Sequence, residues 1–282
     1  MKVLASASDT YWLIDQLRTQ GKRIGLVPTM GALHQGHLSL VQRAKEQTDV
    51  AVVTIFVNPT QFGPNEDFQK YPRTLQSDIE QLESCGCDLV FTPTNQQMYP
   101  LGHSTFIEPP SVAKDWEGKI RPGHFRGVAT IVMKLFQIIP AHVGYFGRKD
   151  YQQVAVIRAM ARDLNLPILI QACETIRETD GLAMSSRNRY LSPSQRARAL
   201  GLSKALKMGQ TLIDQGCTSG QTIEDAMRIE LTKAPVDSID YAAVVHPDTL
   251  EPVESIDGPV VGIIAARIGN TRLIDNATFI RG

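Results

Sequence analysis

The chain lacks most of the features that mark secreted, membrane-spanning or nucleic-acid-binding proteins. Its 282 residues include only four cysteines, whose scattered positions suit a reducing cytoplasm. The first residues contain no apolar segment long enough for a signal peptide, and no apolar run approaches the length that spans a membrane. Lysine plus arginine equals aspartate plus glutamate, at 29 each, so no global basic field attracts a phosphate backbone. We expect a cytoplasmic globular protein without a membrane or nucleic-acid partner.

What is present is an alternation of strands and helices through residue 176. Residues 50–57 are almost uniformly apolar and β-branched, as in a parallel strand covered on both faces. Further strands are expected at 23–28, 88–91, 142–146 and 167–173, with helices beginning near 37 and over 74–84, 127–139 and 151–163. This alternation predicts an α/β fold with a doubly wound, Rossmann-like parallel sheet, which binds its ligand beyond the carboxyl ends of the strands.

The pattern changes after residue 176. The polar segment 176–189 is interpreted as a mobile linker, and Ser192-Pro193 as a helix cap followed by the first helical residue. Two helices are expected at 193–215 and 219–233, followed by strands at 239–246, 260–266 and 272–274. We therefore predict two domains, a Rossmann-like domain over 1–176 and a smaller C-terminal α+β domain over 177–282.

The segment Met-Gly-Ala-Leu-His-Gln-Gly-His, residues 30–37, places two imidazoles at the junction of a predicted strand and a predicted helix. Backbone N–H groups and the helix dipole favour an anion at such a junction, so a nucleotide phosphate is the expected ligand. The alternative is a pair of solvated histidines at a helix start. A zinc site is less attractive, because two histidines need further ligands and the cysteines form no second spaced pair.

Two amide side chains, Asn58 and Gln61, follow the strand at 50–57. The amide of Gln61 offers donors and an acceptor together, which suits a substrate with a hydroxyl and a carboxylate. The alternative for Asn58 is a turn stabilised by its own side chain before Pro59.

Three further segments carry cationic groups beside glycines. The segment 118–127 is expected to be a basic loop before a helix, or simply a solvated loop. In 144–153, Gly147 allows close approach to a nucleotide and Lys149 supplies a positive charge for a phosphoryl oxygen, although an ordinary helix start capped near Asp150 is the alternative. The segment 181–189 combines hydroxyls with guanidinium groups that could close over a triphosphate, or it is a flexible connection.

Taken in order, these segments resemble the family of pantoate–β-alanine ligases, the pantothenate synthetases, of the His-x-Gly-His nucleotidyltransferase superfamily. The superfamily is also similar to class I aminoacyl-tRNA synthetases. The resemblance covers essentially the whole chain and rests on residues 28–37, 56–63, 71–74, 146–153 and 180–188.

The resemblance implies a two-step reaction. The carboxylate of pantoate attacks the α-phosphorus of ATP and releases pyrophosphate, and the amine of β-alanine then attacks the pantoyl adenylate and releases AMP. It also implies ATP as a substrate, Mg²⁺ on the β and γ phosphates, and a homodimer. No protein ligand for Mg²⁺ is implied.

The resemblance further assigns roles to residues of this chain. His37 would be the proton donor toward the departing phosphate, and the other catalytic residues would be His34, Lys149, Ser186 and Arg187. Gln61 and Gln153 would bind pantoate, and Gln61 would also lie near β-alanine. ATP would contact a larger set: Met30, Gly31, Ala32, Leu33, His34, Gln35, Gly36, His37, Gly147, Arg148, Lys149, Asp150, Ile176, Met184, Ser185, Ser186 and Arg187.

One position departs from the family pattern, since Arg148 stands where the family usually has glutamate. We expect this side chain to face solvent. Two other functions stay open: a nucleotidyltransferase that makes a diphosphate-linked product, and a nucleotide sensor without turnover. A tRNA ligase is disfavoured, because the C-terminal part is small and has no strong basic excess.

Overall fold

The computed structural model describes residues 1–64 and 66–281. It divides into two compact units. The N-terminal unit comprises Met1–Gly147 and Gln152–Glu174, and the C-terminal unit comprises Arg148–Tyr151 and Thr175–Gly282. The boundary near residue 174 lies close to the predicted one at 176, but the short segment Arg148–Tyr151 makes its contacts with the C-terminal unit.

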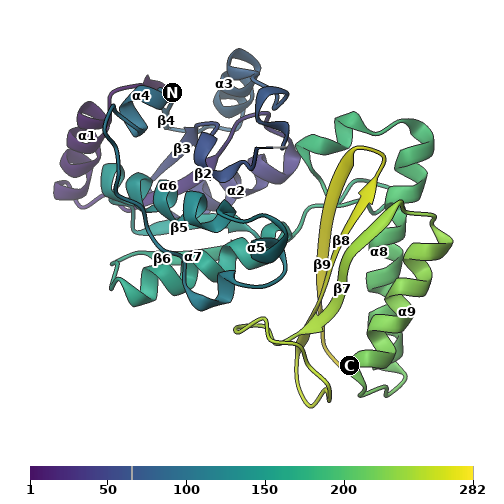
Figure 1. Cartoon of the computed structure of the whole chain (residues 1–282). Helices are drawn as coiled ribbons and strands as arrows, with labels where there is room; N and C mark the ends of the chain where they lie inside the picture. Colours follow the sequence, from purple (N-terminus) through teal and green to yellow (C-terminus); the bar gives the residue numbers. More distant parts are fainter. Residues whose placement is uncertain (65, 282) are drawn as a thin grey trace. The chain divides into compact units, whose positions relative to one another are not determined.

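The N-terminal unit is built on a six-stranded sheet in which every strand pair is parallel, in the order β1-β4-β3-β2-β5-β6 (Figure 1). The strands are β1 (Lys2–Leu4), β2 (Ile24–Thr29), β3 (Val50–Ile55), β4 (Leu89–Phe91), β5 (Val143–Gly147) and β6 (Leu169–Cys173). This confirms the doubly wound α/β prediction, although β1 was not foreseen. The strand order reverses between β2 and β5, which is where such sheets bind ligands.

Helices connect these strands. They are α1 (Ala7–Thr19), α2 (Gln35–Gln47), α3 (Leu75–Ser84), α4 (Asn95–Met98), α5 (Glu117–Ile120), α6 (His124–Ile138) and α7 (Tyr151–Asp163), with 3₁₀ turns η1 (Pro59–Gln61), η2 (Asp67–Gln69) and η3 (Ser111–Ala113). Among the described residues, no helix is long and apolar enough to cross a bilayer.

Side chains of successive strand residues pack into two different apolar clusters. Val52 joins the cluster that includes residues of α1, α6 and α7, whereas its neighbour Val53 joins the cluster that includes residues of α2 and Leu82 of α3. The period of two along each strand therefore buries both faces of the sheet under helices.

The C-terminal unit has one antiparallel sheet in the order β7-β8-β9, with two helices along one face (Figure 1). Its elements are η4 (Arg148–Asp150), η5 (Ser186–Tyr190), α8 (Pro193–Asp214), α9 (Gly220–Lys233), β7 (Ser238–Val245), β8 (Val260–Ile268) and β9 (Thr271–Phe279). The predicted cap is confirmed, because the Ser192 hydroxyl accepts a hydrogen bond from the Gln195 N–H and the Gln195 side chain accepts one from the Ser192 N–H.

Two sequence interpretations were wrong. The expected basic loop at 118–127 is mostly helical: α5 ends at Ile120 and α6 begins at His124. Gly123 makes the tight connection between them possible, because it adopts a left-handed conformation with φ +82°. The segment 176–189, expected to be a mobile linker, forms a short antiparallel bridge between Arg177 and Ala183 and then η5. It folds because Leu182 is buried in the apolar core of the C-terminal unit.

Candidate active site

The turn between β2 and α2 carries the two predicted imidazoles and has an unusual backbone. Gly31 and Ala32 both adopt positive φ angles, of 79° and 51°. Alanine in this region is strained, so the surrounding structure must hold the turn. The Thr29 hydroxyl does part of this: it donates to the carbonyl of Thr54 at 2.7 Å and accepts from the Gly31 N–H at 3.2 Å.

Asp78 on α3 provides the other anchor of this turn. Its carboxylate accepts the backbone N–H groups of Ala32 and Leu33, at 3.0 and 2.9 Å, and the hydroxyl of Thr74 donates to it at 3.2 Å. The side chain is buried. Two N–H groups of the turn therefore already bind a carboxylate. The sequence analysis missed Asp78; its signal is the spacing from Thr74, which places both residues on one helix face.

The imidazoles of His34 and His37 lie side by side. Their ring centroids are 4.1 Å apart. His34 caps α2, because its Nδ1 accepts the N–H of Gly36 at 3.1 Å. A nitrogen that accepts carries no proton, so the neutral His34 ring holds its hydrogen on Nε2. The structure brings together the two histidines that the sequence singled out.

Gln61 and Met30 are also brought together, from the ends of adjacent strands. The amide nitrogen of Gln61 lies 2.8 Å from the sulfur of Met30, and its oxygen accepts from Asn58 at 3.2 Å. Asn58 has a structural role, since its side chain also contacts Thr60, Tyr99 and the carbonyl of Gly127. The turn alternative for Asn58 is therefore the better interpretation.

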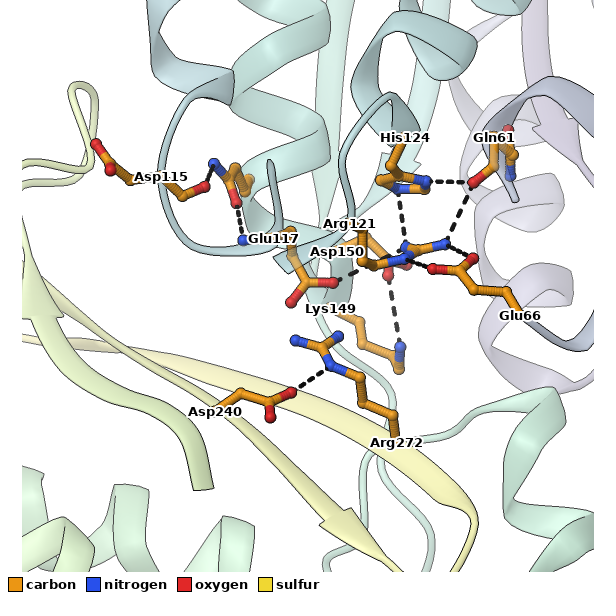
Figure 2. Close-up of polar contacts among 11 residues, drawn as sticks. Gln61, Glu66, Asp115, Glu117, Arg121, His124, Lys149, Asp150, Asp240 and Arg272 are labelled. Atoms are coloured by element: carbon orange, nitrogen blue, oxygen red, sulfur yellow. Dashed lines mark hydrogen bonds and ion pairs between the residues drawn. The ribbon is translucent and has the colours of Figure 1, made fainter. Parts of the chain in front are cut away.

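A partly buried polar cluster holds the backbone of Gln61 (Figure 2). The carbonyl of Gln61 lies 2.8 Å from Nδ1 of His124, whose Nε2 lies 3.0 Å from the Arg121 guanidinium. Because arginine only donates, Nε2 accepts, and the hydrogen of His124 is on Nδ1. Arg121 also forms a bidentate ion pair with Glu66, with both contacts at 2.6 Å.

Burial and the neighbouring Arg121 charge lower the pKa of His124 to about 4, so the ring is neutral at physiological pH. Burial alone would raise the pKa of Glu66, but the hydrogen bonds and charge of Arg121 outweigh it and hold this pKa below its ordinary value. The cluster therefore stays in one protonation state, with a charged ion pair beside a neutral imidazole.

The two neighbouring glutamines of α7 differ in their surroundings. The Gln152 side chain accepts from the N–H of Glu117 at 2.9 Å and donates to the carbonyls of Val112 and Asp115, at 2.9 and 2.8 Å. The Gln153 side chain is half-buried and has no hydrogen-bond partner among residues 1–64 and 66–281. Gln153, which we expect to bind pantoate, is thus the glutamine whose side-chain amide forms no hydrogen bond with the described residues.

The C-terminal unit carries the other predicted residues on two turns. Lys149 lies on η4, where its ammonium group is 3.5 Å from the carboxylate of Asp150. Arg148 on the same turn is half-buried, so the expectation that it faces solvent is met only in part.

The segment that was expected to close on phosphates begins as a hairpin. Met184 donates its N–H to the carbonyl of Ile176 at 3.0 Å, which brings together two residues expected to contact ATP. The Ser185 hydroxyl then caps η5 by accepting from the Arg187 N–H at 3.3 Å, and Ser186 is buried. Among residues 1–64 and 66–281, no three His, Cys, Asp or Glu side chains gather into a possible metal site.

Known proteins similar to this chain are pantothenate synthetases. The relative from Koribacter versatilis is 50% identical over 276 residues, which are 98% of this chain and 95% of that protein. The relative from Moorella thermoacetica is 50% identical and covered to 98% in both chains.

Solved structures agree. The crystal structure of pantothenate synthetase from Thermus thermophilus matches with a TM-score of 0.94 and 42% identity, covering 98% of this chain and 99% of that one. The pantoate-beta-alanine ligase from Francisella tularensis, complexed with beta-gamma ATP and beta-alanine, matches with a TM-score of 0.81 and 35% identity over 98% and 97% of the two chains.

The profile of the family described as Pantoate-beta-alanine ligase matches residues 2–278. Because the motifs, the fold and these relatives agree over nearly the full length, the chain belongs to the pantoate-beta-alanine ligase family.

Proposed function

We propose that the chain condenses (R)-pantoate with β-alanine to form pantothenate, with consumption of ATP and through a pantoyl adenylate. In the first step a carboxylate oxygen of pantoate bonds to the α-phosphorus and pyrophosphate leaves. In the second step the amine of β-alanine bonds to the acyl carbon and AMP leaves with the bridging oxygen. Family membership and the solved relative complexed with beta-gamma ATP and beta-alanine support this reaction.

The N-terminal unit supplies the imidazoles and the amides. We assign His37 as the proton donor toward the departing phosphate, with His34 beside it as a second donor. Both rings lie beyond the carboxyl end of β2, at the reversal of the strand order. Gln61 and Gln153 bind the hydroxyl and carboxylate of pantoate, and Gln61 also serves β-alanine.

The C-terminal unit supplies positive charge and hydroxyls. Lys149, Ser186 and Arg187 donate to phosphate oxygens as negative charge builds on them, which is the main contribution a protein makes to phosphoryl and nucleotidyl transfer. The ATP contacts are Met30–His37, Gly147–Asp150, Ile176 and Met184–Arg187. Closure of the Met184–Arg187 segment protects the adenylate from water, because acyl adenylates hydrolyse readily.

Magnesium accompanies the nucleotide in this proposal. The ion would neutralise charge on the β and γ phosphates, with phosphate oxygens and water as its usual ligands, and we assign it no protein ligand. We further propose a cytoplasmic homodimer, in which the domain expected over 1–176 serves ATP and pantoate and the domain expected over 177–282, joined by Arg148–Tyr151, acts as the lid.

The contact between Gln61 and Met30 carries this proposal. It joins the residue expected to bind a hydroxy acid to the turn expected to bind a nucleotide, with an N to S distance of 2.8 Å. A ligase that transfers an adenylyl group to a carboxylate needs these two substrates side by side.

The test is a coupled assay with ATP, pantoate and β-alanine, in which each is omitted in turn. We expect pyrophosphate to need ATP and pantoate, and AMP to need all three at substantial rates. A diphosphate-linked product would instead support another nucleotidyltransferase. ATP binding without any pantoate-dependent turnover would indicate a nucleotide sensor.

A further inference from the structure

Two consecutive buried polar residues, Asp275 and Asn276, stand out on β9. Polar residues rarely fill adjacent strand positions with both side chains buried, because the two point to opposite faces. Asp275 is 3% exposed and Asn276 is 7% exposed. Each therefore needs a hydrogen-bonding partner on its own side of the strand.

Asn276 finds its partners in the turn that carries Lys149. Its side-chain amide donates to the carbonyls of Arg148 and Lys149, at 2.9 and 2.8 Å. One primary amide has two N–H hydrogens, so the two bonds use its full donor capacity. Two donors from one rigid group to consecutive carbonyls fix the orientation of both peptide groups in η4.

The position of η4 in the chain makes this contact informative. The turn lies between β5, which ends at Gly147, and the body of α7, and both of these belong to the N-terminal unit. Sequence neighbours alone would assign Lys149 to that unit. The contacts assign Arg148–Tyr151 to the C-terminal unit instead, and the amide of Asn276 is a main part of that attachment.

Asp275 makes the corresponding contact on its side of β9. Its carboxylate forms a bidentate ion pair with Arg177, at 2.7 and 2.9 Å. Arg177 bridges to Ala183, and the chain then runs directly into Met184–Arg187. Adjacent residues of one strand thus hold the two segments of the C-terminal unit to which we assign phosphate contacts.

We propose that Asn276 is a positioning residue for the ligase reaction. It fixes the backbone on which Lys149 stands, so that the ammonium group and the Ser186–Arg187 segment are carried on one rigid strand. This inference rests on the proposed function. Asn276 itself does not touch substrate; it acts through Lys149.

The experiment is a double-mutant cycle on pantoate-dependent pyrophosphate release by the full chain. Asn276→Ala removes the donors, and Asn276→Asp keeps the shape but turns a carboxylate toward two carbonyl oxygens. Each is made alone and in the Lys149→Ala background, where the backbone carbonyls that Asn276 binds are still present. Thr278→Ala is the matched control, because Thr278 is an exposed residue of the same strand.

We expect Asn276→Ala to lower kcat by about 10- to 100-fold, since a shift of the order of an ångström in a reacting group has effects of this size. The KM for pantoate should change little, because Gln61 and Gln153 belong to the N-terminal unit. In the Lys149→Ala background the same substitution should change kcat less than about twofold, because residues that act through one another are not additive. Thr278→Ala should leave the kinetics unchanged.

Equal losses in the two backgrounds would overturn the inference, because a purely structural effect of Asn276 does not depend on the Lys149 ammonium group. Normal kcat in both Asn276 variants would also overturn it. A wild-type chain that releases no pyrophosphate with pantoate would overturn the proposed function, and this inference with it.

Discussion

The two units hold their candidate residues in different ways. In the N-terminal unit, buried side chains bond to the backbone next to the site: Asp78 holds the imidazole turn, and His124 holds the carbonyl of Gln61. In the C-terminal unit, Lys149 and Ser186 stand on short 3₁₀ turns, η4 and η5, and neighbouring side chains of β9 hold η4 and the hairpin that precedes η5.

This difference predicts different responses to mutation. The N-terminal network combines turn geometry with buried charge, so its loss should affect stability and pH dependence together with activity. In the C-terminal unit, changes at the residues that hold η4 and the hairpin before η5 should act mainly on the rate. Mutations in each network, taken in order of decreasing effect, test this contrast.

His37→Ala should lower the rate of pantoate-dependent pyrophosphate release by about 10²- to 10⁴-fold, which is the usual contribution of a general acid or base. The free energy of unfolding should change little. His142→Asn is the matched control, because His142 lies at the amino end of β2, where its Nδ1 accepts from Ile24. Near-normal pyrophosphate release by His37→Ala would refute the assigned role.

Asp78→Asn should lower both stability and activity. The two oxygens of Asp78 each accept one backbone N–H, whereas the NH₂ group of asparagine cannot accept. One buried donor is therefore left unsatisfied, at a cost of about 1–3 kcal/mol in unfolding free energy. Displacement of the imidazole turn should also lower kcat by roughly 10²-fold. Urea denaturation and initial rates measure the two effects.

The control for Asp78 is Asp88→Asn, since the Asp88 carboxylate also accepts a backbone N–H, that of Ala51 at 2.8 Å, but away from the imidazole turn. It should lose stability and keep kcat. If Asp78→Asn behaved in the same way, Asp78 would be no more than a structural anchor.

His124→Asn should reduce the dependence of stability on pH. The folded chain holds the pKa of His124 at about 4 against an ordinary value of 6.5, so between these values the unfolded chain binds more protons. Stability is therefore lost as the pH falls below 6.5, and from pH 6.5 to 5 this histidine accounts for roughly 1–2 kcal/mol.

Urea denaturation at pH 8, 6.5 and 5 tests this. The range above pH 5 limits the contribution of Glu66, because Arg121 holds the pKa of this carboxyl below its ordinary value. The asparagine variant should show the smaller loss of unfolding free energy between pH 6.5 and 5. Identical losses in the variant and the wild type would show that His124 is not a source of the pH dependence.

Arg148→Glu, which restores the residue usual in the family, should have the smallest effect. Arg148 is half-buried, and Asn276 holds its backbone carbonyl rather than its side chain. We expect the KM for ATP to change less than about threefold, in line with substitutions away from buried networks. A larger change would mean that this side chain faces the nucleotide.

Local patterns predicted the fold well where one segment determines its own structure. The helix predicted at 151–163 has these bounds in the structure, because its apolar spacing is regular, and the cap at Ser192 follows from its own four residues. The strand predicted at 272–274 is in fact β9, Thr271–Phe279. Its extension was missed because Asp275 and Asn276 interrupt the apolar pattern, and only distant partners make their burial possible.

The candidate site, like the fold, was predictable from the sequence only where a local pattern marks it. The sequence singled out the imidazole turn, Gln61 and the Lys149 turn as candidates, because each combines reactive groups with a strand end. It missed Asp78 and Asn276, whose contacts lie 46 and 127 residues away along the chain. No periodicity carries such information, since the contact exists only when the sheets have formed.

Adenylation of the pantoate carboxylate is the step on which the proposed reaction depends. The most direct measurement uses pantoate labelled with ¹⁸O in its carboxylate, turned over with ATP and β-alanine, followed by mass spectrometry of the nucleotide product. Adenylation predicts AMP that carries one oxygen from pantoate per turnover. Unlabelled AMP would contradict it, as would the formation of ADP together with inorganic phosphate that carries the label.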